Sequence, residues 1–101
     1  MFILAYADHS FSDREKARSW MAKLQDWGYS TVIIGNLSPG AMIVDEEARA
    51  AGMNVSQSPA VVLPSRPSLV VVFRHPTLHA SSVDRGVNYA KLHHIDMIVA
   101  Y

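Results

Sequence analysis

Residues 2–28 read FILAYADHSFSDREKARSWMAKLQDWG, and this stretch decides the fold class. Its opening run, Phe2–Ala7, is apolar and by itself compatible with either a strand or a helix. Ser12 and Glu15 then form a capping-box pattern, which predicts the start of a helix, and Gly28 is typical of the position just after one. The stretch therefore predicts a buried strand, a loop and an amphipathic helix of about four turns. The apolar residues expected on the core face of this helix are Ala17, Trp20, Met21, Leu24 and Trp27.

The rest of the chain continues the alternation of strands and helices. Runs of β-branched and apolar residues predict the strands Thr31–Ile34, Met53–Val55, Leu69–Phe73 and Met97–Ala100. Ser38 and Gly52 delimit a helix predicted over Pro39–Ala51. Ser81 or Ser82 is predicted to cap a last helix.

Strands and helices that alternate at this spacing predict βαβ units joined by right-handed crossovers. We therefore expect an α/β, Rossmann-like, three-layer domain on a five-stranded parallel sheet of order 3-2-1-4-5, with about three helices. Pro59, Pro64 and Pro67 interrupt the stretch before the fourth strand, so the helix between strands 3 and 4 is predicted to be missing. The length of 101 residues suits one domain, so residues 1–101 are predicted to form a single Rossmannoid unit.

Composition and charge exclude several classes of function. Nine basic residues balance nine acidic ones, which argues against a nucleic-acid polymer or an anionic membrane as a partner. The absence of cysteine excludes disulfides, zinc–cysteine sites and thiol nucleophiles, and it suits a reducing compartment. The N-terminal apolar run lacks the features of a signal peptide, and no run approaches the roughly 20 apolar residues of a membrane span. We therefore expect a cytoplasmic protein.

Ligands of an open α/β sheet bind at the carboxyl ends of the strands, near the point where the strand order reverses. Three loops of the predicted fold reach this edge, after the strands that end at Ala7, Ile34 and Phe73. Two of these loops lead into helix N-termini, whose free N–H groups suit a phosphate. The candidate ligand-binding residues are Asp8, His9, Ser10, Gly35, Asn36, Ser38, Gly40, His75, Ser81 and Ser82. No pattern in the sequence names a catalytic residue.

Most of these residues also have an ordinary structural interpretation. The glycines are typical of turns and close packing, and the serines are typical helix caps. Asp8 and His9 are either an acid–base pair or a solvated pair at an exposed strand end. His75 and His79 have Pro76 between them, which disfavours a shared helical face for metal binding. We therefore predict neither a metal site nor a cofactor.

Two motifs resemble the SLOG superfamily of Rossmannoid domains. Residues 1–13, MFILAYADHSFSD, are similar to the hydrophobic strand and following turn with which those domains begin. Residues 35–41, GNLSPGA, and residues 46–55, EEARAAGMNV, resemble the family's glycine-rich loop and the alanine-rich helix behind it. The resemblance spans nearly the whole chain and is closest to the small stand-alone branch, which is distantly related to the Lonely Guy phosphoribohydrolases. It implies a nucleotide-related ligand and, in the hydrolytic relatives, cleavage of a nucleotide N-glycosidic bond.

The glycine motifs of that family are degraded in this chain. The family glycine after the first strand falls on Ala7, the arginine of that turn on His9, and the second glycine of the glycine pair on Asn36. The loop after the fourth strand, which is rich in glycine in the family, has none here. Without glycine the backbone approaches a phosphate less closely, so these departures loosen the expected phosphate cradle.

The residues used by hydrolytic relatives are the least matched part of the resemblance. Their glutamate has its nearest match in Ser82 or Asp84, and Arg66 alone stands in the region of their arginine. We therefore expect the protein to bind a nucleotide or a nucleotide-derived small ligand, without robust catalysis. A phosphoribohydrolase-like N-glycosidase, in which Asp8 or Asp84 stabilises the transition state, is an alternative.

A protein-interaction module on a decayed Rossmannoid domain is a further alternative. The missing helix leaves one face of the sheet to a loop that contains Ala60–Leu63, and a loop covers less of a sheet than a helix does. Exposed apolar surface of this kind usually binds a partner. On this ground we predict a homodimer through that face.

The local charge of the predicted cleft differs from the neutral total. Its basic and titratable residues are His9, Arg74, His75 and His79, and its acidic residue is Asp8. This balance predicts a mildly positive cleft that becomes more positive as the histidines protonate. Such a cleft suits one small anion better than a polyanion.

Overall fold

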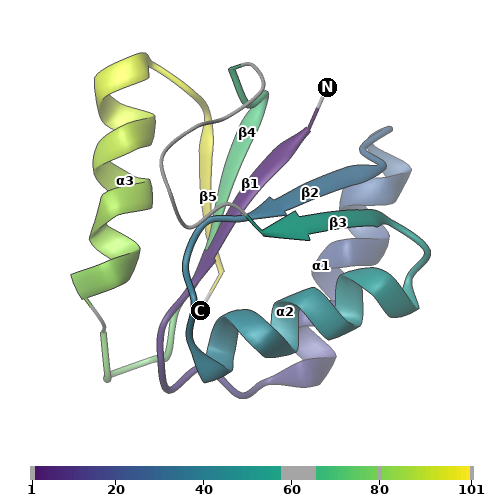
Figure 1. The fold of residues 1–101 in the computed structure, drawn as a ribbon, viewed down its shortest axis with the longest axis horizontal. Helices are drawn as coiled ribbons and strands as arrows, with labels where there is room; N and C mark the ends of the chain where they lie inside the picture. Colours follow the sequence, from purple (N-terminus) through teal and green to yellow (C-terminus); the bar gives the residue numbers. More distant parts are fainter. Residues whose placement is uncertain (1, 58–65, 80, 101) are drawn as a thin grey trace.

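The computed structural model describes residues 2–57, 66–79 and 81–100, and in them five strands form one parallel sheet. The strand order is β3-β2-β1-β4-β5, which confirms the predicted topology. The strands are β1 (Ile3–Ala7), β2 (Thr31–Ile34), β3 (Asn54–Gln57), β4 (Leu69–Phe73) and β5 (Met97–Ala100). The helices within these residues are α1 (Arg14–Asp26), α2 (Pro39–Ala50) and α3 (Ser81–His93). Helices α1 and α2 cover one face and α3 covers the other, so the domain has the predicted three layers (Figure 1).

The observed bounds agree closely with the predicted ones. Strands β2, β4 and β5 have the predicted residues, whereas β3 starts at Asn54 and extends to Gln57. The predicted absence of a helix between β3 and β4 rests mainly on residues 58–65, which lie outside the described part of the chain. None of the described helices combines the length and the apolar composition needed to cross a membrane.

The start of α1 differs from the prediction by one residue. Asp13, and not Ser12, is the N-cap, and its carboxylate accepts the backbone N–H of Lys16 at 3.0 Å. Glu15 is therefore the second helical residue, too early in the helix for the reciprocal contact of a capping box. Both Ser12 and Asp13 suit an N-cap, and the box pattern favoured the wrong one of two adjacent candidates.

Strands β1, β2 and β4 are buried on both faces, as their unbroken apolar runs predict, whereas the edge strand β3 is largely exposed. The side chains of β1 alternate between the faces: Ile3, Ala5 and Ala7 pack with α1 and α2, and Leu4 and Tyr6 pack with α3. Each fully buried aliphatic side chain contributes roughly 1.5–3 kcal/mol through the hydrophobic effect. The core therefore supplies the main stabilising term of the fold.

The core face of α1 is narrower than predicted. Its buried residues are Ala17, Met21 and Leu24. Trp20 is partly buried, but Trp27 is 53% exposed and does not belong to the core. The two indoles instead meet edge to face at 6.3 Å between ring centroids, so Trp27 packs on the helix surface.

Ion pairs join α1 to α2 on the side of the two helices that faces away from the sheet. Arg18 Nε lies 3.0 Å from a carboxylate oxygen of Glu47, which is buried between the helices. Arg14 reaches both Glu47 at 3.4 Å and the exposed Glu46 at 3.1 Å. The charge of the buried glutamate is therefore compensated by two guanidinium groups.

Tyr6 occupies a slot between two glycines. A β carbon at Gly35 would lie 2.5 Å from Tyr6 Cζ, and one at Gly86 would lie 2.3 Å from Tyr6 Cδ2. Burial raises the pKa of the Tyr6 phenol above its ordinary value, and the nearby charge of Arg85 is a smaller, opposing influence. The ring thus fills the space that the two missing side chains leave between the β2–α2 loop and α3.

All three helices end in the same hydrogen-bonded turn. After α1 the N–H of Tyr29 donates to Leu24 O at 3.0 Å, and after α2 the N–H of Met53 donates to Ala48 O at 3.1 Å. The residue that makes each of these turns is a glycine with positive φ, Gly28 at 97° and Gly52 at 86°. These are Schellman motifs, and they confirm the predicted helix-ending glycines.

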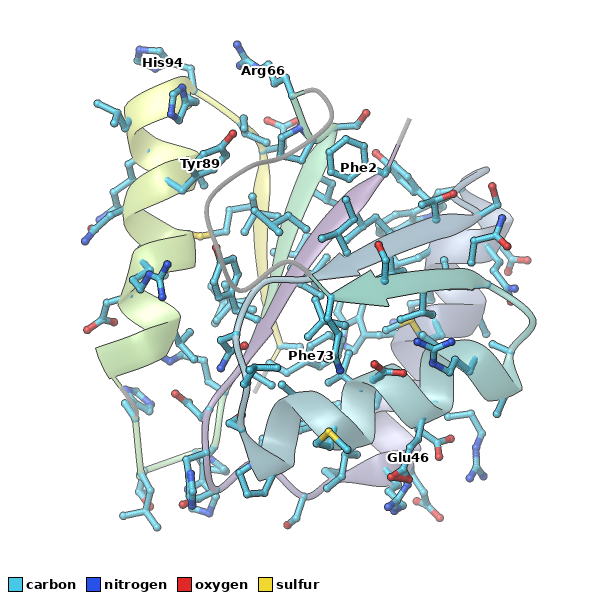
Figure 2. All side chains as sticks on the ribbon, in the orientation of Figure 1. Phe2, Glu46, Arg66, Phe73, Tyr89 and His94 are labelled. Atoms are coloured by element: carbon cyan, nitrogen blue, oxygen red, sulfur yellow. The ribbon has the colours of Figure 1, made fainter. Side chains whose placement is uncertain are left out.

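The third of these turns uses a histidine instead of glycine. After α3 the N–H of Ile95 donates to Ala90 O at 2.9 Å, and His94 adopts φ 54°. Arg66 caps the same helix end, because its guanidinium donates to the carbonyl oxygens of His93 and His94 (Figure 2). A cation at this position also stabilises the negative end of the helix dipole.

The face predicted to form a homodimer is polar where the described residues of β3 expose it. On β3 the residues that share a face with Ile33 are Asn54 and Ser56, and both are exposed and polar. Ile33 itself is buried in the cluster beneath α3. Residues 60–63, which contributed to the prediction of a dimer, lie outside the described part of the chain.

We predict that His94→Gly stabilises the protein by about 0.5–1 kcal/mol, measured as the free energy of unfolding in urea. The left-handed conformation costs a non-glycine residue about 1–2 kcal/mol, and the entropy that glycine gains in the unfolded chain offsets part of this. Gly52→Ala is the matched control and should lose about 1 kcal/mol, since its β carbon would meet no atom within 4 Å and the change acts on the backbone alone. A loss of stability in His94→Gly would contradict the prediction.

We also predict that Gly86→Ala destabilises the protein by about 1–3 kcal/mol, because its β carbon would overlap the Tyr6 ring. The sign of the change in unfolding free energy is diagnostic, because replacing glycine by alanine inside a helix ordinarily stabilises a protein by about 1 kcal/mol. Urea unfolding of Gly86→Ala in wild-type and Tyr6→Leu backgrounds should show that the smaller side chain removes most of the loss. Equal losses in the two backgrounds would show that the ring is not the cause.

Candidate functional site

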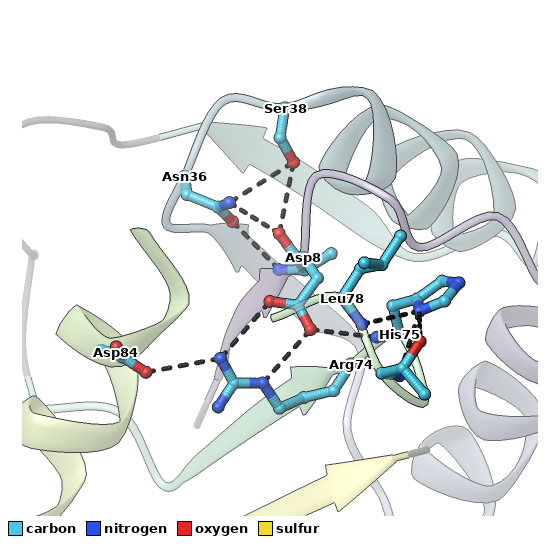
Figure 3. A network of polar contacts seen from close by, with 9 residues as sticks. Asp8, Asn36, Ser38, Arg74, His75, Leu78 and Asp84 are labelled. Atoms are coloured by element: carbon cyan, nitrogen blue, oxygen red, sulfur yellow. Dashed lines mark hydrogen bonds and ion pairs between the residues drawn. The ribbon is translucent and has the colours of Figure 1, made fainter. Parts of the chain in front are cut away.

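A buried ion pair lies at the point where the strand order reverses. Ala7 and Phe73 pair in register at the ends of the neighbouring strands β1 and β4, so the residues that follow them, Asp8 and Arg74, are neighbours. Arg74 Nε lies 3.2 Å from Asp8 Oδ2, and Nη2 lies 3.4 Å from Oδ1 (Figure 3). Asp8 is 0% exposed, and the Arg74 side chain is 12% exposed. A buried pair of opposite charges therefore lies at the position where open α/β sheets usually bind their ligands.

Arg74 also connects this pair to α3. Its Nη2 lies 3.4 Å from Asp84 Oδ1 in the first turn of the helix, and the Asp84 carboxylate is largely exposed. Burial, the largest single influence, lowers the pKa of Arg74, but the hydrogen bonds and charges of Asp8 and then Asp84 together raise it above its ordinary value. Arg74 therefore faces two carboxylates, and the prediction of a mildly positive cleft is wrong at its centre.

Asp8 also anchors the loop that follows β4. Its Oδ2 accepts the backbone N–H of His75 at 3.0 Å, in addition to the contact with Arg74. Both carboxylate oxygens thus have donors within the chain. The expectation that Asp8 and His9 form a solvated pair at an exposed strand end is wrong for Asp8, which is buried, while His9 is exposed in the turn closed by the Phe11 N–H on Asp8 O at 3.0 Å.

The β2–α2 loop is fastened to the end of β1 by side chains. The Asn36 amide accepts the Ala7 N–H at 3.0 Å and donates to Ala7 O at 2.8 Å. The Ser38 hydroxyl donates to Ala7 O at 3.2 Å and accepts the Ala41 N–H at 3.0 Å, which confirms its predicted role as the N-cap of α2. The polar groups of both residues are therefore engaged within the chain.

The two predicted site glycines are explained by close approaches inside the protein. At Gly40 a β carbon would lie 2.0 Å from the carbonyl oxygen of Asp8, so glycine lets the start of α2 approach the β1–α1 turn. At Gly35 the neighbour is the Tyr6 ring, as described above. Both positions match the ordinary packing interpretation of these glycines.

The structure brings several of the predicted residues together at the end of β1. Asp8 and His75 are joined directly, and Gly40 touches Asp8 through the backbone. Ser10 is partly buried in the β1–α1 turn beside the exposed His9. The side chains of Ser81 and Ser82 at the start of α3 lie outside the described part of the structure, so their predicted roles stay predictions.

A pocket of about 140 Å³ opens beside the ion pair, between the start of α1 and the β4–α3 loop. Its lining residues are Phe11, Ser12, Asp13, Lys16, Arg74, His75 and Pro76. Phe11 packs against Phe73 at 5.4 Å between ring centroids, so one wall is aromatic and held by the core. The basic and titratable lining residues are Lys16, Arg74 and His75, and the acidic one is Asp13. Arg74 is already paired with Asp8 and Asp84, so Lys16 is the lining residue that adds positive charge to the pocket.

Of these lining residues, the sequence predicted His75 as a candidate ligand-binding residue and Arg74 as a basic residue of the cleft. The pairing of Asp8 with Arg74 could be predicted from the strand order, because opposite charges directly follow two strands predicted to be adjacent. The position of Lys16 could not be predicted, since it depends on how the first turn of α1 faces a loop far along the chain. Arg66, the nearest counterpart of the hydrolase arginine, lies at the C-terminal end of α3 and therefore at the opposite edge of the sheet (Figure 2).

Comparisons with protein-family models, with curated proteins and with solved structures found no match. The geometry of the strand-end edge is therefore the basis for a function. Within the described part of the chain, no three histidine, aspartate or glutamate side chains gather in a way that would hold a metal ion. This edge of the sheet therefore carries a small pocket with basic lining residues next to a buried ion pair.

We predict that Asp8→Asn destabilises the protein by about 3 kcal/mol in urea unfolding, because it leaves a largely buried guanidinium without its main counter-charge. Asp84→Asn is the matched control, since it removes the other carboxylate on Arg74 from an exposed position and should cost less than about 1 kcal/mol. Equal, small losses in both variants would show that the buried pair does not stabilise the fold.

Proposed function

We propose that the protein is a SLOG-like domain that binds a nucleotide or a nucleotide-derived small ligand at the carboxyl ends of the strands, without robust catalysis. The observation that carries this proposal is the pocket lined by Lys16, Arg74 and His75 next to the strand-order reversal. Ligand sites of open α/β sheets are concentrated at this position. A reducing, cytoplasmic setting suits a chain without cysteine.

The size of the pocket favours an anionic group of a ligand over a whole nucleotide. Its 140 Å³ corresponds to roughly five water molecules, whereas pockets that enclose a complete small ligand are typically about 300–1,000 Å³. A phosphate fits such a volume and pairs with Lys16 and Arg74. The ribose and base would then lie over the exposed loops after β1 and β4, where His9 and Leu78 are accessible.

The state of the carboxylates supports binding over N-glycosidic hydrolysis. A hydrolase of this kind needs a carboxylate aimed at the sugar, and both oxygens of Asp8 already accept hydrogen bonds from Arg74 or His75. Asp84 is the more accessible carboxylate, but it too is within reach of Arg74. Hydrolysis is therefore the weaker of the two nucleotide-related proposals.

The test is a titration followed by NMR or thermal shift with AMP, cyclic AMP, ADP-ribose and adenosine. We expect the phosphorylated ligands to bind at least about tenfold more tightly than adenosine, because a charge-assisted contact to phosphate is worth roughly 1.5–3 kcal/mol. Lys16→Glu should weaken AMP binding by about tenfold or more. Lys23→Glu makes the same charge change at the other end of α1, over the Trp20 ring, and should leave binding within about twofold.

The outcomes of this titration are decisive. No shift with any of the ligands at millimolar concentration would overturn the proposal. Equal binding of AMP and adenosine would show that the basic pocket is not the site. Release of free base from AMP during the titration would favour the hydrolytic alternative.

A protein-interaction function has one specific observation in its favour. Leu37, Met42 and Leu78 are large apolar side chains that are exposed: Leu37 and Leu78 lie in the loops after β2 and β4, and Met42 lies near the start of α2. A partner, including a second copy of the chain, would bury these side chains and gain about 25 cal/mol per Å² of apolar surface. For a dimer built on this rim, sedimentation at tens of micromolar should give twice the mass of the chain, and Leu37→Ser with Leu78→Ser should return it to the monomer. A monomeric wild type would exclude that dimer.

A further inference from the structure

The His75 side chain holds the β4–α3 loop in a turn. Its ring Nδ1 accepts the backbone N–H of Leu78 at 2.9 Å and that of Thr77 at 3.1 Å (Figure 3). Pro76 stands between donor and acceptor residues, and its ring fixes φ at the second position of the turn. The imidazole thus takes the place of the side-chain oxygen that closes turns of this kind at Asn or Asp.

This arrangement requires a neutral imidazole. A nitrogen that accepts two N–H groups carries no proton, so the proton of neutral His75 is on Nε2. An imidazolium has donors on both ring nitrogens, and therefore no rotation of the ring restores the acceptor. Protonation of His75 therefore breaks both backbone hydrogen bonds of the turn, and the protonated Nδ1 then has the Thr77 hydroxyl oxygen, 3.5 Å away, as an acceptor in reach.

The turn is part of the anion pocket. His75 and Pro76 line the pocket together with Arg74, and the backbone N–H of His75 donates to the buried Asp8 carboxylate at 3.0 Å. A change in the turn therefore moves one wall of the pocket and strains the contact that anchors the loop to β1.

We propose that this turn is a pH-sensitive element that forms the pocket wall only while His75 is neutral, so that anion binding weakens on acidification. The role in anion binding rests on the proposed function, whereas the response of the turn itself does not. The expected change in anion affinity on acidification is the opposite of the change predicted from charge alone, because protonated histidines would by their charge strengthen anion binding.

The charges around His75 come from every element that packs against the loop. From the end of β1 comes Asp8, which binds the His75 backbone and is neutralised by Arg74. From the start of α1 come Asp13 and Lys16, which line the same pocket. Asp84 on α3 reaches Arg74 and not the imidazole, and His79 lies further along the same loop. The proposal therefore rests on the two backbone hydrogen bonds that Nδ1 accepts, and not on these charges.

The first experiment uses the ligand-free protein. Imidazole and amide ¹⁵N NMR spectra are recorded between about pH 7.5 and pH 5.5, the range in which a histidine ordinarily changes charge. We expect the Nε2–H tautomer at the upper end, and amide shifts of Thr77 and Leu78 that move together with the protonation of His75. Amides that ignore the state of His75, or a proton on Nδ1 of the neutral ring, would overturn the inference.

His75→Asn is the matched control, because the Asn Oδ1 accepts the same N–H groups and does not titrate. In this variant the amides of Thr77 and Leu78 should not change with pH, whereas in His75→Ala they should resemble the acidic wild type at every pH. If the Asn variant responds to pH as the wild type does, another group controls the loop. If a variant fails to fold, the tautomer of His75 and the amide titration of the wild-type protein are enough to test the inference.

The second experiment measures cyclic AMP and sulfate binding at the two pH values, since neither anion changes charge in this range. In the wild type, loss of the two hydrogen bonds should weaken binding by about tenfold at the lower pH. In His75→Asn the change should be less than about twofold. Stronger binding at the lower pH would overturn the proposed effect of the turn on anion binding. Absence of binding at both pH values would overturn the proposed function, and the first experiment would then decide whether the turn responds to pH.

Discussion

The contact between Asp8 and Arg74 is the constraint on which the carboxyl edge of this protein depends. A carboxylate that is 0% exposed has no water to solvate it, so the fold must supply a cation and hydrogen-bond donors. Arg74 and the backbone of His75 supply them, and in doing so they fix where the chain leaves β4. The same guanidinium reaches Asp84 on α3. One buried carboxylate and its partner Arg74 thus join the ends of the neighbouring strands β1 and β4, the loop beside the pocket and the start of α3.

The two edges of the sheet are built by different means. At the amino edge each helix returns to the sheet through a backbone turn of the same type, so three unrelated sequences converge on one geometry. At the carboxyl edge the loops are held by side chains, among them Asn36 and Ser38 on Ala7 and the His75 imidazole on Leu78. Apart from the buried Asp8, the side chains that hold these loops can be exchanged or titrated while the strands stay paired through their backbones, so the edge that carries the pocket is the more adaptable one.

The sequence predicted what is local and missed what depends on distant partners. The apolar run Leu69–Phe73 and the helix-ending Gly28 need only their neighbours, and both were located correctly. The burial of Asp8 was missed, because its partner lies 66 residues away and its charge alone indicates exposure. Helical spacing predicts Trp27 in the core, but α1 ends at Asp26 and Trp27 is its exposed C-cap. The SLOG resemblance and the ligand-binding roles of the strand-end residues stay predictions, since the fold alone does not decide function.

The slot around Tyr6 has a consequence for how the sequence of this protein can change over time. Two positions far apart in the chain, 35 and 86, lack a side chain because one aromatic ring occupies the space of both. A lineage that gained a side chain at either position would first need a smaller residue at position 6, and a lineage that lost the ring would leave a cavity until one of the glycines was replaced. The three positions are therefore expected to vary together among descendants of this chain, although no two of them are adjacent in sequence.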